Sequence, residues 1–168
     1  MTLARLKTRK GTSLRAHSTI FALVAACGAL LAFASIALGS PSFNFTSTPL
    51  VTANLDNKVQ LNSDRIKLQT KDPTVVRVAT VVFGAGGSSG WHHHPGFVIV
   101  SVKSGAVTVW NSDCSHETYG AGSAFVESGD DPGQVTSVDG ATNVVTNVVP
   151  NVSPLVFRID DDPPACAT

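Results

Sequence analysis

Charge is scarce in this sequence, and acidic residues are missing from its first 55 positions. Charged residues make up 14% of the 168-residue chain, against about 25% in ordinary globular proteins. Five of the twelve Lys and Arg residues lie within the first fifteen positions, and the first acid is Asp56. Beyond residue 39, seven cations face twelve acids, which leaves a net charge of −5. The scattered cations of this acidic body exclude a basic nucleic-acid surface.

Residues 19–39 contain no charged residue, and they follow the cationic, acid-free residues 1–18. This order is typical of a secretory signal, and small residues at positions −3 and −1 allow cleavage before Ser40. Two alternatives stay open. An apolar run of this length can span a hydrocarbon core of ~30 Å as an uncleaved anchor, and Cys27 offers a site for lipidation. We therefore interpret residues 1–39 as a signal peptide or membrane anchor, expect the body to be secreted or extracytoplasmic, and expect membrane contact only through this segment.

Cysteine is also scarce, and the chain has no CxxC spacing, which argues against a zinc site. Beyond the export segment only Cys114 and Cys166 remain. An even pair in an oxidising compartment favours a disulfide, which would stabilise the fold by about 4 kcal/mol in the chain-entropy treatment. Two unpaired thiols are the alternative.

A helical repeat of apolar residues is absent after residue 40. Runs of β-branched residues separated by turn residues take its place, as in all-β proteins. Strands are expected at residues 65–69, 74–83, 97–102, 106–110, 124–126, 134–138, 143–149 and 155–159, with a turn at 103–105. Strands without crossover helices indicate an antiparallel sandwich or barrel. Residues 40–63, rich in Pro, Ser, Thr and Asn, are interpreted as a linker or N-terminal extension before a single β-domain over residues 64–166.

The most informative residues are three consecutive histidines that follow a glycine-rich stretch. His92 and His94 are two positions apart, so on an extended strand both imidazoles point to one face and His93 to the other. Two converging imidazoles suit a first-row divalent metal. The alternative is an exposed polar turn that binds metal only adventitiously.

Residues 86–105 resemble the first sequence motif of the cupins, G-x5-H-x-H-x3,4-E-x6-G. Gly86, His92, His94 and Gly105 fall in register with it. The resemblance is to small exported bacterial single-domain cupins and covers roughly residues 60–166. It implies a cupin-type, jelly-roll-like antiparallel β-barrel, in which these histidines would be metal ligands.

The same resemblance indicates an incomplete ligand set. Val98 stands at the acid position of the first motif, and Thr136 stands where the second motif, G-x5-P-x-G-x2-H-x3-N, has its histidine. Gln134 shares a strand face with Thr136 and is a candidate third ligand through its carbonyl oxygen. His116 and Glu127 are expected to be solvated. Any metal would be a divalent Fe, Mn, Zn, Cu or Ni ion, bound less tightly than by a full cupin ligand set.

The aromatic residues are few, but Trp91 directly precedes the histidines. We expect a ligand pocket at the barrel mouth with Trp91, Val98 and Thr136 in its wall. For Trp91 the favoured alternative is that it, like Trp110, fills an end of the barrel core. Three functions stay open. The first is non-catalytic binding of a small molecule with weak metal binding, and the second is a metal-dependent oxygenase or isomerase. The third is a structural envelope protein, and a homodimer is compatible with all three. With two ligand positions empty, the sequence favours the first over an enzyme and names no catalytic residue.

Overall fold

The computed structural model describes residues 39–167, so the segment predicted as a signal or anchor lies outside the described residues, apart from Gly39. The strands are β1 (Phe43–Leu55), β2 (Gln60–Asn62), β3 (Lys67–Gln69), β4 (Thr74–Ser88), β5 (His92–His93), β6 (Phe97–Asn111), β7 (His116–Gly120), β8 (Ala124–Ser128), β9 (Gly133–Ser137), β10 (Ala141–Pro150) and β11 (Ile159–Asp160). Within this part of the chain the one helical element is a 3-10 turn, η1 (Ala165–Ala167). No helix in residues 39–167 is long and apolar enough to cross a membrane.

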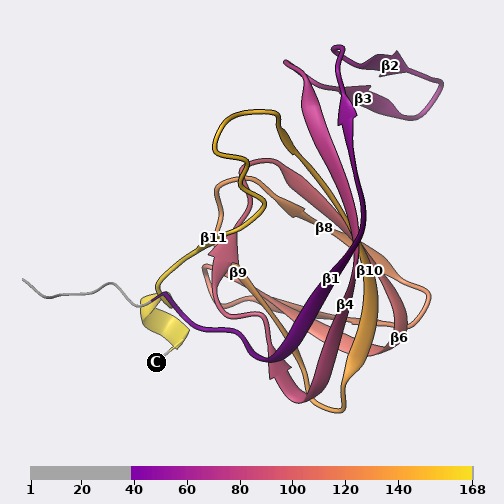
Figure 1. The fold of residues 1–168 in the computed structure, drawn as a ribbon. Helices are drawn as coiled ribbons and strands as arrows, with labels where there is room; N and C mark the ends of the chain where they lie inside the picture. The colour runs from indigo at the N-terminus through magenta and orange to yellow at the C-terminus, as the bar shows by residue number, and fades with distance from the viewer. Residues whose placement is uncertain (1–38, 168) are drawn as a thin grey trace, which may run out of the picture. The chain divides into compact units, whose positions relative to one another are not determined.

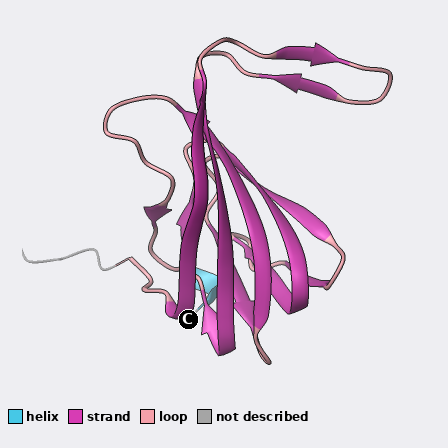
Figure 2. Ribbon diagram, turned by 45° about the vertical axis from the view of Figure 1, so that its right-hand side comes forward, coloured by secondary structure: helices cyan, strands magenta, loops and turns pink. Residues whose placement is uncertain are grey.

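The strands close into a barrel (Figure 1). Strand β4 pairs with β10, β10 with β6, β6 with β9, and β9 returns to pair with β4, all antiparallel. Such a ring has no free edge among its four members. Figure 2 shows that strands and loops account for nearly all of the described chain. The prediction of an all-β antiparallel barrel is therefore confirmed.

The interior follows from strict alternation along the valine-rich strands. In β4, Val75, Ala79, Val81 and Phe83 are buried, while Val82 between them is 44% exposed. Side chains of a strand alternate between its two faces, so the odd-numbered positions of β4 face inward. Two of them, Val81 and Phe83, pack against inward-facing residues of β6, β8 and β9 in one core. This core packs the strands of the barrel against one another.

Paired positions of an antiparallel ladder share a face, so the pairing register sorts the inward residues of β4, β10, β6 and β8 into rungs. One rung, here called the polar rung, consists of Arg77, Asn147, Val98 and Glu127. The next, the apolar rung, consists of Ala79, Val145, Val100 and Phe125. A cation and a carboxylate thus stand at opposite ends of one line across the barrel wall.

The turn expected at residues 103–105 does not interrupt the strand. Strand β6 runs on past it, with a register shift between Thr142 and Asn143 of β10 and a positive φ of 74° at Gly105. The first half of β6 pairs with β10 and β8, and the second half with β7 and β9. The bulge bends the strand so that it can pair with different neighbours along its length.

The linker interpretation of residues 40–63 needs correction, because β1 belongs to the barrel sheet. It pairs with β4 from Phe43 opposite Ser88 to Leu55 opposite Thr74. Its Ser, Thr and Pro content reflects an edge strand with an exposed outer face, where Pro49 is tolerated beside a register shift. Only β2 and β3 form an appendage, an exposed hairpin that projects from the barrel (Figures 1 and 2).

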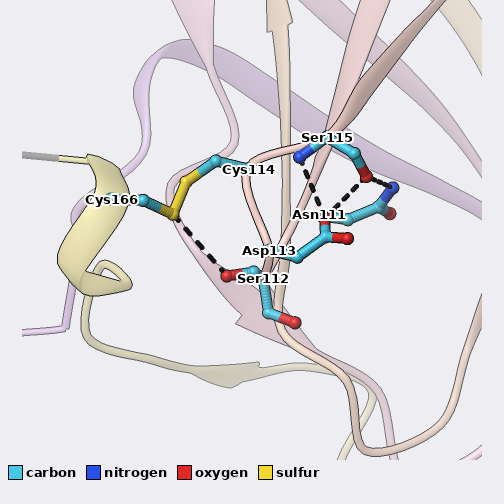
Figure 3. Close-up of a disulfide and its surroundings, with 6 residues drawn as sticks. All are labelled: Asn111, Ser112, Asp113, Cys114, Ser115 and Cys166. Atoms are coloured by element: carbon cyan, nitrogen blue, oxygen red, sulfur yellow. Dashed lines mark hydrogen bonds between the residues drawn. A yellow bond between two sulfur atoms is a disulfide. The ribbon is translucent and has the colours of Figure 1, made fainter.

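The C-terminal segment returns to the barrel and is covalently fixed there. Its strand β11 pairs with β5. The predicted disulfide is present, and it joins Cys114, in the loop after β6, to Cys166 in η1 across 6.2 Å between Cα atoms (Figure 3). The side chain of Asp113 accepts hydrogen bonds from the N–H and O–H groups of Ser115. These bonds order the loop that carries Cys114.

Candidate metal centre and cavity

His92 and His94 lie side by side in the barrel wall. They are 7% and 8% exposed, and their ring centroids are 4.9 Å apart. His93 takes a different position, where its Nδ1 lies 2.7 Å from Oδ2 of Asp161. The residue between the two buried histidines thus binds the C-terminal segment, and the two imidazoles share one site.

Backbone carbonyls orient both imidazoles. Nδ1 of His92 lies 2.9 Å from the carbonyl oxygen of Gly90, and Nδ1 of His94 contacts the carbonyl oxygen of Phe157. A carbonyl can only accept, so each neutral ring carries its proton on Nδ1 and keeps the lone pair of Nε2. The Nε2 atom of His94 is buried and has no hydrogen-bond partner. Both rings therefore have the tautomer and the fixed orientation of metal-binding imidazoles.

Burial keeps His92 neutral. It lowers the pKa of His92 from 6.5 to about 4, and the charge of Arg158 acts in the same direction, while Glu127 opposes them. A neutral imidazole is the form that binds a metal ion. His92 is therefore in its ligand form over the physiological pH range.

Glu127 supplies the third donor. Its Oε2 lies 3.4 Å from Nε2 of His94, and the ligand atoms of Glu127 and the two histidines all lie within 4.8 Å of one another. The expectation that Glu127 is solvated was wrong. Strand β8 pairs Glu127 with Val98, so the carboxylate projects from the strand next to the vacant acid position. Only the register between β8 and β6 reveals this, and no local spacing in the sequence encodes it.

The three side chains fit a divalent transition metal. Two imidazole nitrogens and one carboxylate oxygen are a donor set that Fe, Mn, Ni and Zn ions accept, and three protein ligands leave positions for water or substrate. The unpartnered, buried Nε2 of His94 supports the fit, because a buried nitrogen without a hydrogen bond is costly unless a ligand engages it. His92, His94 and Glu127 are named the metal triad below.

Gln134 lies outside this centre. Its side-chain nitrogen donates to Oγ of Ser88 at 3.0 Å. Thr136 accepts a hydrogen bond from the indole nitrogen of Trp110 at 3.0 Å. Neither residue lines the cavities that the triad lines, so Gln134 as a metal ligand stays a prediction, and Glu127 is the carboxylate that meets the two histidines.

The predicted pocket residues are also placed differently. Trp91 is 3% exposed and Val98 is fully buried, and neither of them nor Thr136 is among the residues that line the cavities described below. The cavity itself has a volume of about 490 Å³ and lies inside the barrel. Its wall is mainly apolar, and the polar groups in it include the metal triad, Ser89, Arg77, Asn143, Asn147 and Arg158.

A second cavity reaches the metal triad from another side. Its volume is about 310 Å³, and its wall contains all three triad residues together with polar groups of the loops after β6 and β8, such as Asp113 and Asp131. The triad thus stands in a wall between a mainly apolar interior cavity and a more polar one. A metal bound there would be reached from both.

Comparisons with known proteins add several solved structures of low similarity. No protein-family model matches the chain, and no curated protein matches it. A conserved protein of unknown function from Streptococcus pyogenes is 19% identical over 58% of this chain and 79% of its own, with a TM-score of 0.43. A cupin superfamily protein from Desulfitobacterium hafniense is 10% identical over 60% of this chain and 80% of its own, also with a TM-score of 0.43.

An enzyme is among the similar structures. The DMSP lyase DddQ from Ruegeria pomeroyi is 16% identical over 52% of this chain, with a TM-score of 0.46. The match covers 44% of the lyase chain, so the present chain spans less than half of that protein.

Proposed function

We propose that this protein binds a divalent transition-metal ion through His92, His94 and Glu127, and binds a small molecule beside that ion in the barrel cavity. The observation that carries the proposal is the convergence of three ligand atoms within 4.8 Å, one of them a buried nitrogen without a hydrogen-bond partner. Such a nitrogen is costly in a protein that holds no metal. The geometry assembles the carboxylate that the sequence motif lacks.

The protein residues have separate parts in this function. The carbonyl oxygens of Gly90 and Phe157 hold the proton of each imidazole on Nδ1, and Nε2 of His94 lies toward Glu127. The apolar rung gives the cavity beside the triad a mainly apolar wall, which strengthens polar interactions there. When bound, the metal supplies Lewis acidity and open coordination positions.

Metal-dependent catalysis is the second candidate, and the two cavities favour it. Because the triad lines both, a small molecule in the apolar cavity leaves the other side of the centre open to water or a second reactant. A three-ligand site retains such open positions. Water-proton relaxation of the manganese-loaded protein tests this, since exchanging water on the ion enhances relaxation. An ion without exchangeable water would remove the catalytic candidate and leave the binding function.

We further propose that the protein works outside the cytoplasm. The Cys114–Cys166 disulfide supports this, because such bonds persist in oxidising compartments. The export signal predicted in residues 1–39 is consistent with it. Mass spectrometry of the protein recovered from its host tests the proposal, and a mature N-terminus at Ser40 together with an oxidised cysteine pair is the expected result.

The metal site is tested by elemental analysis of the purified protein after reconstitution with Fe, Mn, Ni or Zn. We expect near-stoichiometric binding of at least one ion in the wild type and its loss in a His92→Ala/His94→Ala double variant. His116→Ala is the matched control, because His116 is exposed on β7 and lies outside the triad. A wild type that stays metal-free would overturn the proposal.

A further inference from the structure

Arg77 places a cationic side chain in the wall of the apolar cavity. Burial lowers its pKa, so the surroundings disfavour the charge that it carries. Its Nε and Nη2 atoms both donate to Oδ1 of Asn147, at 3.2 and 3.1 Å, and its guanidinium lies 3.8 Å from the centroid of the Phe157 ring. Within residues 39–167 no carboxylate forms an ion pair with it. A partly buried cation normally has an anionic partner.

Arg158, the other arginine of the cavity wall, shows the contrast. It bonds Oδ1 of Asp160 at 2.6 Å and the carbonyl oxygen of Ser89 at 2.7 Å. Its charge is therefore balanced within the protein. Arg77 has an amide oxygen and an aromatic face instead, and its guanidinium has five N–H donors, of which two meet Asn147. The remaining donors are available to a ligand.

The position of Arg77 relates it to the metal triad. Arg77 and Glu127 are the two ends of the polar rung, three strand spacings apart, or roughly 14 Å along the curved wall. Phe157 connects the same two regions, because its ring stacks on Arg77 and its carbonyl oxygen accepts from His94. The cation and the metal triad therefore face one cavity whose intervening wall is mainly apolar.

We propose that the cavity binds a small organic monocarboxylate, whose carboxylate pairs with Arg77 and whose apolar part extends along the apolar rung toward the metal triad. This inference rests on the proposed function, to which it adds the class of ligand. The planar guanidinium matches a carboxylate in a bidentate arrangement. One unbalanced cation suits a monoanion better than a phosphate ester, which carries a charge of about −2. The apolar wall and the cavity volume of about 490 Å³ favour a compact hydrocarbon body.

The test uses the full chain stripped of metal with EDTA, so that carboxylates cannot bind through an ion. Benzoate and hexanoate are compared with benzyl alcohol and hexan-1-ol by calorimetric titration. We expect each carboxylate to bind at least tenfold more tightly than its alcohol in the wild type. Equal affinities in the wild type would overturn the inference without any variant.

Two substitutions of one type sharpen the test. Arg77→Gln should lower the carboxylate affinity at least tenfold and leave alcohol binding unchanged. Arg65→Gln, in the exposed segment between β2 and β3, should change neither. Unchanged carboxylate affinity in Arg77→Gln would contradict the inference. An Arg77→Lys variant, which keeps the charge and loses the planar fork, should bind carboxylates with intermediate affinity.

Metal titration of the same variants separates this inference from the proposed function. Arg77→Gln should bind metal with the wild-type stoichiometry, which also shows that its fold is intact. If the carboxylates bind the wild type only after metal is restored, the Arg77 site is wrong and the metal site stands. If no metal binds but Arg77-dependent carboxylate binding persists, the proposed metal function fails and the anion site stands.

Discussion

The metal triad joins two regions that position their side chains in different ways. His92 and His94 lie in a short, irregular segment, and each is held by a hydrogen bond from Nδ1 to a backbone carbonyl. Glu127 lies in a regular antiparallel ladder, opposite Val98. The imidazoles thus depend on specific hydrogen bonds, whereas the carboxylate depends only on the register of two strands.

The comparison shows where the site is vulnerable. One of the two carbonyls belongs to Phe157 in the C-terminal segment. The same segment contains β11, which pairs with β5, and the disulfide anchors it. Loosening that segment should therefore disturb the imidazoles and leave the β6–β8 ladder intact. The carboxylate should respond instead to substitutions at Glu127 and Val98.

The largest effect is expected from removing the disulfide. A Cys114→Ser/Cys166→Ser variant frees a loop closed over a sequence separation of 52, which lowers the free energy of unfolding by about 4 kcal/mol in the chain-entropy treatment. Urea unfolding with and without reductant measures this. Because the freed segment carries Phe157, metal affinity should fall as well. Ser112→Ala is the control, because it changes the loop that carries Cys114 and leaves the disulfide intact. If unfolding of the double variant matches that of the wild type, the tail does not depend on its covalent anchor.

The second effect is the pH dependence of the metal-free protein. His92 has a pKa of about 4 when folded and 6.5 when unfolded, so between these values the unfolded chain binds more protons than the folded one. The contribution of neutral His92 to the free energy of unfolding is therefore fully present above pH 6.5 and is lost as the pH is lowered to 4. The loss approaches roughly 3 kcal/mol at 1.36 kcal/mol per pKa unit.

Unfolding titrations at several pH values measure this slope. His92→Gln should flatten it between pH 6.5 and 4, while the exposed-site variant His116→Gln should keep the wild-type profile. A wild-type slope retained in His92→Gln would show that other groups cause the pH dependence and that burial does not hold His92 in its neutral form.

The third effect tests the ladder. Glu127→Val should lower metal affinity at least about 100-fold, since it removes one of three donors. Adding Val98→Glu to that variant moves the carboxylate across the ladder to the neighbouring strand. We expect the double variant to bind metal at least tenfold more tightly than Glu127→Val alone. Competition with a chromophoric chelator measures both changes. Glu117→Gln, on β7, is the control for loss of an acid. No recovery in the double variant would mean that the position of the acid on β8 is essential.

The same division explains which features the sequence could predict. The two histidines are two positions apart, so local alternation alone places them on one face. The disulfide follows from the two cysteines that remain in a chain predicted to be exported, and the strands follow from alternating valines. Glu127 could not be found this way, because a pairing between β6 and β8 brings it to the site. Residues 43–55 were missed because an exposed edge strand shares the Ser, Thr and Pro content of a linker.

The smallest effect concerns the hydrogen bonds behind the imidazoles. The hydroxyl of Ser89 donates to the carbonyl of Gly90 at 2.9 Å, accepts the N–H of Val135 at 2.9 Å, and lies 3.5 Å from Nδ1 of His92. Ser89→Ala keeps every metal ligand but leaves the N–H of Val135 without its acceptor, which costs about 1 kcal/mol of stability. It also loosens the carbonyl that orients His92.

Outer hydrogen-bond partners of metal-binding histidines contribute roughly ten- to hundredfold in metal affinity, and we expect Ser89→Ala to fall at the lower end because Gly90 still accepts the imidazole proton. Ser128→Ala, at an exposed position beside Glu127 on β8, is the matched control and should retain wild-type affinity, because the carboxylate is held by the ladder. Equal losses in the two variants would show that imidazoles and carboxylate are positioned in the same way. A loss confined to Ser89→Ala would locate the hydrogen-bonded support of the centre on its histidine side.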